Sequence, residues 1–441
     1  MSELLYYLAN AIIAYALLLV LWTALKRPTS IRYAFANMFR QRRRSGITLL
    51  AIIMGGVAVF IFGGFVQHSF SSLREQTIRT NLGHLQLYRE GYLASGATNP
   101  LRYGIPGYEE IKRALAEDAE LGPMLKTVTG QIEFSGIASH YESETSTFIS
   151  GVGIEPTSSL TLGALDRIVL GSDLSRVDGL GATIGTGVAK GLSATYDDDL
   201  DLLVVNPTGG QNAMSVTVRG VMQSGIKEYD DRALKLPLQT AQDLLETDEV
   251  SRIIILLNDT ELTDAALARV KALIAERGFK LEVRPWSELA VYYHQVVSLF
   301  DGIFFFIKSI VSVIVVFMIG NTLMMNVVER TREIATLRAL GLTQSEVGRL
   351  FILEGIFIGL LGAALSVLVG IGLAELININ GLPMPPSPGY TKGYLAFILW
   401  DENFGLFWFT CALAIVTAVL ASIIPAKRAS KLLIAEAFRF T

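Results

Sequence analysis

A charged segment between two long apolar stretches is the part of this sequence best suited to bind another protein. It runs from Asn326 to Leu342, and its ionisable residues are Glu329, Arg330, Arg332, Glu333 and Arg338. Charged groups at this density are too costly to place in lipid, so the segment must lie in water beside a membrane. The spacing predicts a helix with Ile334, Leu337 and Leu340 on one side, which leaves the charged side chains to form ion pairs with a partner. Gly341 is suited to cap this helix.

The rest of the sequence offers little chemistry. No G-x-x-x-x-G-K-[ST] or G-x-S-x-G motif is present, so neither a nucleotide-phosphate loop nor a serine nucleophile elbow is expected. The histidines are scattered, with no i, i+4 pair, and the sole cysteine, Cys411, lies in an apolar run. The acidic run Asp197–Asp201 lacks the ligand spacing of a calcium loop and indicates a solvated turn. We therefore expect no catalytic and no metal-binding residues.

Composition places the chain among membrane proteins. It has 441 residues, of which 51% are hydrophobic, and its mean hydropathy is +0.44. This length allows two or three domains. The net charge of −4 gives no overall basic surface, so nucleic acid is not expected as a partner.

The N-terminal region combines an apolar stretch with a basic one. Residues 4–25 are long enough to cross a bilayer, and they lack the basic start and cleavage site of a secretory signal, so we predict a retained span. Residues 26–46 are rich in arginine and lysine, with aromatic residues at helical spacing. This pattern predicts an amphipathic helix on the cytoplasmic surface that is attracted to anionic membrane lipids.

The next predicted span, residues 47–68, contains four glycines: Gly55, Gly56, Gly63 and Gly64. Gly56 and Gly63 are seven residues apart and therefore lie on nearly one helix face, where another helix can approach closely. This predicts helix packing or a dimer seam. The alternative is that glycine is simply more common in transmembrane helices.

Residues 69–297 have the composition of a soluble domain. Strand patterns occur in the ranges 131–137, 146–154, 200–205, 214–222 and 252–257. The last of these, with a helix over 264–277 and a strand over 280–284, predicts a βαβ unit and hence an α+β domain. The short loop Asn206, Pro207, Thr208, Gly209, Gly210 has the composition of a hairpin turn and is a possible partner-binding loop.

Further spans are predicted at residues 298–328, 349–376 and 404–424, joined by the charged connection 329–348 and the external loop 377–403. The tail 425–441 carries basic residues on the same side as residues 26–46, as the positive-inside rule requires. Asn321 and Asn326 are expected to bond neighbouring helices. Glu354 is expected to have a structural role, paired with Arg349 or Arg338.

The charged segment and the glycine-rich span after it resemble the coupling helix of ABC-transporter permeases of the MacB, LolC/LolE and FtsX superfamily, also called type VII or mechanotransmission permeases. The proline-rich loop MPPSPGYTKGY is similar to that of LolE-like members, and the tail resembles the closing pattern of the family. An N-terminal span is a departure from the family pattern. The resemblance implies a polytopic α-helical membrane protein with four core transmembrane helices, an extra N-terminal one, and a large α+β periplasmic domain between the first and second core helices.

The resemblance also implies partners. A separate ATPase would hold the coupling segment at Glu329, Arg330, Arg332, Glu333, Arg338 and Gly341. Two copies of that ATPase would bind ATP and Mg, so the chain itself would need no cofactor. Two permeases would pair as a homodimer or with a homologue. The periplasmic domain would consist of a porter-like lobe and a β-rich insertion at about 128–235. In LolC a longer hairpin hooks a soluble carrier, so the short loop 206–210 weakens a direct LolC assignment.

Two functions follow from the resemblance. The first is an inner-membrane permease that uses ATP hydrolysis by its partner to extract or export a lipoprotein or another amphiphile, with a possible periplasmic carrier or adaptor. The alternative is an FtsX-like signalling scaffold that activates a periplasmic cell-wall hydrolase without transport. The predicted spans carry too few polar residues to line a deep aqueous channel.

Overall fold

The computed structural model describes residues 2–40, 42–95, 100–158, 167–175, 179–224, 227–384, 394–401 and 404–432. The chain divides into two compact units. One comprises residues 1–71, 297–384 and 395–441, and the other comprises residues 72–296 and 385–394. Residues 385–393 and 402–403 of the predicted external loop, and residues 433–441 of the tail, lie outside the described residues.

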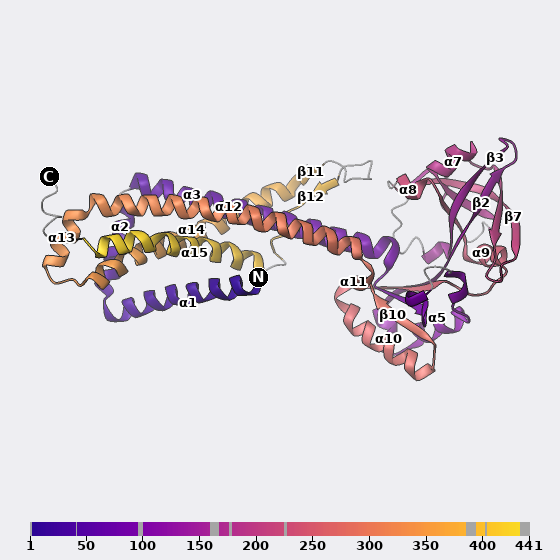
Figure 1. The fold of residues 1–441 in the computed structure, drawn as a ribbon, viewed down its shortest axis with the longest axis horizontal. Coiled ribbons are helices and arrows are strands. Elements are labelled where there is room, and N and C mark those ends of the chain that lie inside the picture. Colours follow the sequence, from indigo (N-terminus) through magenta and orange to yellow (C-terminus); the bar gives the residue numbers. More distant parts are fainter. Residues whose placement is uncertain are drawn as a thin grey trace. The chain divides into compact units, whose positions relative to one another are not determined.

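The first unit is a bundle of long helices (Figure 1). Within the described residues, five helices are long and apolar enough to cross a membrane: Tyr7–Lys26, Arg43–Thr77, Val291–Glu329, Gln344–Asn380 and Gly405–Ser430. They belong to α1 (Ser2–Lys26), α3 (Arg42–Thr77), α12 (Val291–Glu329), α14 (Gln344–Asn380) and α15 (Phe404–Ser430). Their number agrees with the four core spans and one extra span expected, and which of them cross a membrane stays a prediction.

Shorter helices complete this unit. The basic N-terminal segment forms α2 (Pro28–Arg40), and α13 (Thr331–Ala339) connects α12 to α14. Helix α15 continues through Pro425 to Ser430, although Pro425 was expected to end it. A proline removes only its own N–H from the helix, and neighbouring helices in an apolar bundle hold the remaining turns in place.

Small and aliphatic side chains hold the bundle together. Ile52, Ile319 and Leu323 are almost fully buried in its main core, with alanines of α15 packed against them. Helix α1 joins this core through Ile13 and Ala16, which are 5% and 1% exposed. The extra N-terminal helix is therefore packed against the bundle rather than separate from it.

The second unit contains one curved sheet with helices packed on it. Its strands are β1 (Leu85–Arg89), β2 (Leu125–His140), β3 (Thr145–Ile154), β4 (Arg167–Gly171), β5 (Gly181–Gly185), β6 (Asp199–Val205), β7 (Gln211–Gln223), β8 (Ala233–Pro237), β9 (Arg252–Leu257) and β10 (Leu281–Pro285). The strand order is β10-β1-β9-β2-β3-β8-β5-β7-β4, and β6 pairs with both β2 and β7. The ring β2-β3-β8-β5-β7-β6 therefore closes on itself as a small barrel.

The other end of the sheet forms an α+β lobe. Strand β1 pairs antiparallel with both β9 and β10, so β9 and β10 run parallel on either side of it. Helix α10 (Thr263–Arg277) connects them and packs near β10 (Figure 1). The predicted βαβ unit is confirmed, but it is split by β1. The predicted strands are also present, whereas β1, β4, β5 and β8 were not predicted.

Smaller helices cover this sheet. They include α5 (Tyr108–Glu117), α7 (Thr186–Leu192), α8 (Lys227–Asp230), α9 (Leu238–Leu245) and α11 (Trp286–Leu289). The hydrophobic core is continuous from the lobe into the barrel and includes Leu85, Leu87, Ile132, Leu202 and Ile255. The long strand β2 contributes to both parts, pairing first with β9 and then with β3 and β6. Both parts of this unit therefore share one packed interior.

Candidate functional site

The short helix α13 (Thr331–Ala339) has well-defined ends. Arg330 precedes it with φ −100° and ψ 15°, which breaks the helical run from α12. Gly341 follows it with φ 102°, a conformation that favours glycine. Thr343 then starts α14 through a capping box with Glu346. The prediction that Gly341 ends this helix is confirmed.

Two faces of α13 differ in exposure. Ile334 and Ala335 are 2% and 1% exposed, and Ile334 packs into a small core with α12, α14 and α15. Thr336 and Ala339 are exposed, and Leu340 is 77% exposed. Leu340 had been predicted on the same side of the helix as Ile334, but the helix ends at Ala339, so Leu340 lies in the turn that follows it.

The carboxylates of this segment pair with arginines of the N-terminal region. Glu329 pairs with Arg44 of α3, and Glu333 Oε1 lies 2.6 Å from Arg40 Nη2 of α2. Both pairs are partly exposed, with arginine side chains 59% exposed at Arg40 and 41% at Arg44. Arginines expected to contact lipid thus also neutralise the glutamates expected to contact a partner.

Arg332 and Arg338 differ in their surroundings. Arg332 is exposed, whereas Arg338 Nη1 donates a hydrogen bond to the carbonyl oxygen of Leu432. Arg338 therefore ties α13 to the chain that follows α15. Binding of a partner by either arginine stays a prediction.

Arg330 lies at the centre of this site. Its Nε donates to Glu333 Oε2 at 3.1 Å, its Nη1 to Glu354 Oε2 at 3.4 Å, and its Nη2 to the hydroxyl of Tyr33 at 3.2 Å. The guanidinium also lies 5.7 Å from the ring centroids of Tyr33 and Phe351. One side chain thus contacts α2, α13 and α14. We call Arg330, Tyr33, Glu333, Glu354 and Asn326 the Arg330 hub.

Glu354 is buried, with a side chain that is 3% exposed. Its partner is Arg330. Arg349 or Arg338 had been expected as the partner, and that prediction is wrong. Asn326 Nδ2 also donates to Glu354 Oε1 at 3.4 Å, which confirms the expected helix–helix bond of that asparagine. Arg330 had instead been expected to reach a partner protein. The pairing could not be deduced without knowing how α13 folds back.

The N-terminal helices contribute residues that the sequence did not single out. Tyr33 of α2 contacts Arg330, and the Arg349 guanidinium lies 4.9 Å from the ring centroid of Trp22 in α1. Arg27 forms an ion pair with Glu346 at the start of α14. Aromatic residues interleaved with arginines were the available signal, and they were interpreted as lipid-facing.

Each of the four glycines of α3 lies against another segment of the same chain. The nearest residues to a Cβ built on Gly55, Gly56, Gly63 and Gly64 are Val315, Ser366, Leu406 and the Ile398–Leu399 segment, respectively. These four glycines therefore allow close packing within this chain. A dimer seam at these positions stays a prediction.

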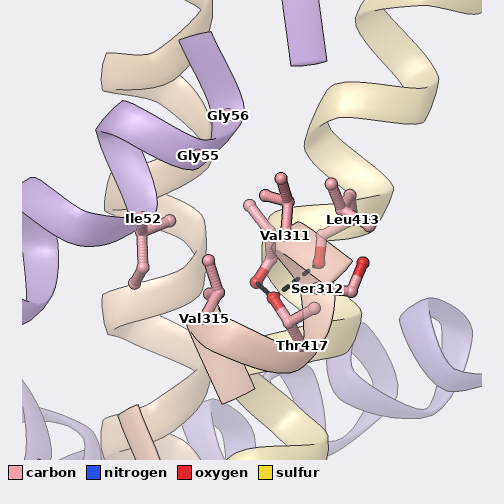
Figure 2. A pocket seen from close by; sticks show the side chains of 9 residues that line it. Ile52, Gly55, Gly56, Val311, Ser312, Val315, Leu413 and Thr417 are labelled. Atoms are coloured by element: carbon pink, nitrogen blue, oxygen red, sulfur yellow. Dashed lines mark hydrogen bonds between the residues drawn. The ribbon is translucent and has the colours of Figure 1, made fainter. Parts of the chain in front are cut away.

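A small pocket lies between α3, α12 and α15 (Figure 2). Its volume is about 10 Å³, and it is lined by Ile52, Gly55, Gly56, Val311, Ser312, Val315, Leu413, Ala414 and Thr417. The hydroxyls of Ser312 and Thr417 donate to backbone carbonyls of their own helices. A space of this size holds about one water, so this pocket is not a passage for a substrate.

The loop 206–210 is held by its first residue. Asn206 is 8% exposed, and its Oδ1 accepts hydrogen bonds from Thr208 N at 3.2 Å and Gly210 N at 2.7 Å. Its Nδ2 donates to Glu246 Oε2 at 2.7 Å, at the end of α9. The loop, including Pro207 and Gly209, is therefore a fixed turn in the structure, and its role in binding a partner stays a prediction.

Two parts of this chain match known protein families. Residues 305–434, which include α13 and α14, match the family described as FtsX-like permease C-terminal. Residues 45–273, more than half of the 441, match the MacB-like periplasmic core domain. The chain belongs to the FtsX and MacB superfamily of ABC-transporter permeases. The resemblance predicted from the charged segment is confirmed.

The permease is also similar to individual members of this superfamily. It is 28% identical over 274 residues to the lipoprotein-releasing system transmembrane protein LolC of Neisseria meningitidis, a match that covers 58% of the permease and 64% of that relative. It is 23% identical to LolE of Haemophilus influenzae over 86% of the permease and 90% of LolE. It is also 23% identical to the uncharacterized ABC transporter permease YknZ of Bacillus subtilis, over 93% of the permease and 98% of YknZ. The similarity to LolE and YknZ thus extends over most of both chains.

The permease is therefore a membrane protein of the LolC, LolE, MacB and FtsX type, with a MacB-like core domain and several apolar helices. Members of this family are permeases rather than enzymes.

Proposed function

We propose that this permease is the transmembrane subunit of an ABC transporter that extracts or exports a lipoprotein or another amphiphile. A separate ATPase, present in two copies, would bind ATP and Mg and hold α13 on the cytoplasmic side. The large α+β unit would then lie in the periplasm and change conformation when ATP is hydrolysed. Two permeases, identical or homologous, would form the membrane part in the bacterial inner membrane.

The exposed face of α13 is the observation that carries this proposal. Thr336 and Ala339 of α13, and Leu340 in the turn after it, are exposed on a short connection between two membrane-length helices. Leu340 is 77% exposed, and a protein that binds α13 would bury it. This short connection lies within the residues that match the FtsX-like family.

The cargo class rests on relatives and on the shape of the bundle. Two relatives are named for lipoprotein release. The pocket between α3, α12 and α15 is too small for a substrate, which supports entry of the cargo from the outer leaflet or the periplasm rather than through a channel. A periplasmic carrier or adaptor would receive it.

Purification of the tagged permease from its native membrane in mild detergent tests the proposal. Mass spectrometry would identify both the proteins and the lipids that co-purify. We expect an ABC ATPase together with a lipoprotein or a periplasmic carrier. An ATPase accompanied only by a cell-wall hydrolase or its activator would favour the FtsX-like signalling function instead, and the absence of any ATPase would contradict both.

Variants of α13 test where the ATPase binds. Leu340→Asp places a charge in the exposed apolar face and should reduce recovery of the ATPase. Charge reversal at Glu333 or Arg338 should release the ATPase or uncouple its hydrolysis, without unfolding the permease. Ser345→Asp, at an exposed position in the first turn of α14, serves as a control that should leave binding unchanged. Equal recovery in all variants would contradict docking on α13.

A further inference from the structure

The three nitrogen atoms of the Arg330 guanidinium contact residues of three different helices. Nε faces Glu333 of α13, Nη1 faces Glu354 of α14, and Nη2 faces Tyr33 of α2. On the far side of Glu354, Asn326 of α12 donates to its second carboxylate oxygen. The Arg330 hub therefore connects four helices, α2, α12, α13 and α14, through side chains at one point.

The central pair of the hub is buried. The side chains of Arg330 and Glu354 are 11% and 3% exposed, and Phe351 beside them is 3% exposed. Separating opposite charges in such surroundings costs more than separating a pair at the surface, because the buried Glu354 carboxylate would keep the neutral amide of Asn326 but lose its cationic partner. When one of these two residues is displaced, the other is therefore pulled with it.

The covalent connection from α13 to α14 is a short turn that contains a glycine. It runs through Leu340, Gly341 and Leu342, where Gly341 has φ 102° and no atom of the described residues, apart from its neighbours in the chain, lies within 4 Å of the position of a Cβ. A turn with a glycine and open space around it can absorb a movement by changing its backbone angles. The contact between Arg330 and Glu354 bypasses this turn.

Two other ion pairs of the site are more exposed to solvent than Arg330–Glu354. Arg40–Glu333 and Arg44–Glu329 are partly exposed, with arginine side chains 59% and 41% exposed. Exposed pairs contribute little and can be exchanged for contacts with water or with a partner. They can open when α13 moves, whereas the buried pair holds.

We propose that Arg330 and Glu354 are positioning residues that transmit movement of α13 directly to α14. This inference rests on the proposed function, in which an ATPase displaces α13. The hub acts as a joint: the buried pair moves α14 with α13, while the exposed pairs of α2 and α3 release and re-form. Tyr33 and Asn326 keep the two charged groups aligned from either side.

The test measures movement of α14 separately from ATPase binding. Nitroxide labels at Phe306→Cys in α12 and Ile379→Cys in α14 lie on exposed side chains, 65% and 73% exposed, away from α13. Cys411→Ala removes the sole native cysteine. Pulsed electron paramagnetic resonance on the permease–ATPase complex would compare the label distance without nucleotide and with ATP trapped. In the otherwise unchanged complex we expect an ATP-dependent change in this distance.

The decisive variant replaces both members of the pair with apolar residues of similar size, Arg330→Met with Glu354→Leu. A buried ion pair replaced in this way usually leaves folding intact, so the melting temperature and ATPase recovery should stay at the unsubstituted level. The ATP-dependent distance change should fall by at least about fivefold. The control, Arg44→Gln, breaks the exposed pair with Glu329 without changing a residue expected to bind the ATPase, and it should keep that change.

The possible outcomes are separable. If the ATPase binds the Arg330→Met/Glu354→Leu variant and the ATP-dependent distance change is normal, the proposal that this pair transmits movement from α13 to α14 is contradicted. A variant that fails to fold would be replaced by Glu354→Gln, which keeps the shape of the side chain and is held to the same criterion. Loss of ATPase binding by the unsubstituted permease would instead contradict the proposed function, before the joint is tested.

Discussion

Gly56 of α3 and Ser366 of α14 are in such close contact that a Cβ atom on Gly56 would lie 2.6 Å from the Cβ of Ser366. Ser366 is fully buried, and its hydroxyl donates to the carbonyl oxygen of Gly362 at 2.7 Å. The serine therefore has no free space into which it could move. The two helices can be this close only because residue 56 has no side chain.

Gly56→Ala should consequently destabilise the permease. Overpacking of a buried contact costs about 1–3 kcal/mol, and thermal unfolding in detergent would measure it as a lower melting temperature. Gly372→Ala is the matched control, because Gly372 lies in α14, the helix of Ser366, and no atom of the described residues outside its own helix backbone is within 4 Å of its Cβ position. Equal melting temperatures for the two variants would show that the contact at Gly56 can relax.

The positions of the long helices could be predicted from sequence because their signal is local. Length and hydropathy identify an apolar stretch regardless of what packs against it. Likewise, the alternation of residues identified β2, β3, β6 and β7. Strand β5, GATIG, is buried at every position and made of small residues, so it gives no alternating pattern.

The ion pair of Glu354 could not be predicted, because it depends on residues that are far apart in sequence. Its partners are Asn326 of α12 and Arg330 at the junction before α13, the next contact is Tyr33 of α2, and Tyr33 is 297 residues from Arg330 in sequence. Such contacts depend on how the helices pack, which no local pattern encodes. The charged segment was recognised from its composition, but which of its charges face inward required the fold.

Asp118 anchors α10 to the loop before β2. Its carboxylate accepts from Arg269 Nη2 at 2.6 Å and from Leu121 N at 2.9 Å. The hydrogen bonds from Arg269 lower the pKa of Asp118 to about 2, below its ordinary 3.8. The contribution of this carboxylate to stability is therefore complete above pH 3.8 and is lost as the pH falls through about 2.

Asp118→Asn should loosen α10. Hydrogen exchange at pH 7, followed by mass spectrometry of the full-length permease, should show exchange in residues 263–277 at least about tenfold faster. Glu120→Gln is the matched control, because Glu120 lies 3.8 Å from Arg269 and its side chain is 75% exposed. Similar exchange in both variants would mean that the Arg269 contact does not hold this helix.

Tyr108 connects α5 to the start of the barrel. Its hydroxyl donates to Glu155 Oε1 at 2.5 Å and accepts from Gly130 N at 2.7 Å. Tyr108→Phe leaves the buried Gly130 N–H without this partner, which should cost about 1–3 kcal/mol. Tyr141→Phe, at a residue that is 88% exposed, should change stability by less than about 0.5 kcal/mol. Urea unfolding of the full-length protein distinguishes the two, and an equal loss would contradict the role of the Tyr108 hydroxyl.

His84 is held in its neutral form by a chain of hydrogen bonds. Leu257 N donates to His84 Nδ1 at 3.0 Å, and Thr260 Oγ1 donates to Glu75 Oε1 at 2.7 Å. The hydroxyl proton of Thr260 is thereby committed to Glu75, so His84 Nε2, 3.0 Å from Thr260 Oγ1, must be the donor in that contact. If His84 Nδ1 were protonated, it would be a donor facing the Leu257 N–H, and the hydrogen bond between them would be lost.

Burial lowers the pKa of His84 to about 4 from 6.5. The charged groups around it act in both directions: Glu75 and Asp259 raise the pKa, whereas Arg79 and Arg74 lower it. Because the unfolded chain binds this proton more readily, stability is complete above pH 6.5 and falls as the pH drops toward 4.

We therefore expect exchange in residues 252–257, corrected for its intrinsic pH dependence, to accelerate between pH 6.5 and 4. The loss of stability should be about 1.4 kcal/mol for each pH unit within this window. His84→Gln keeps a polar side chain that does not titrate, so its stability should change less over the same range. A slope as steep in this variant as in the unsubstituted permease would assign the pH dependence to other groups.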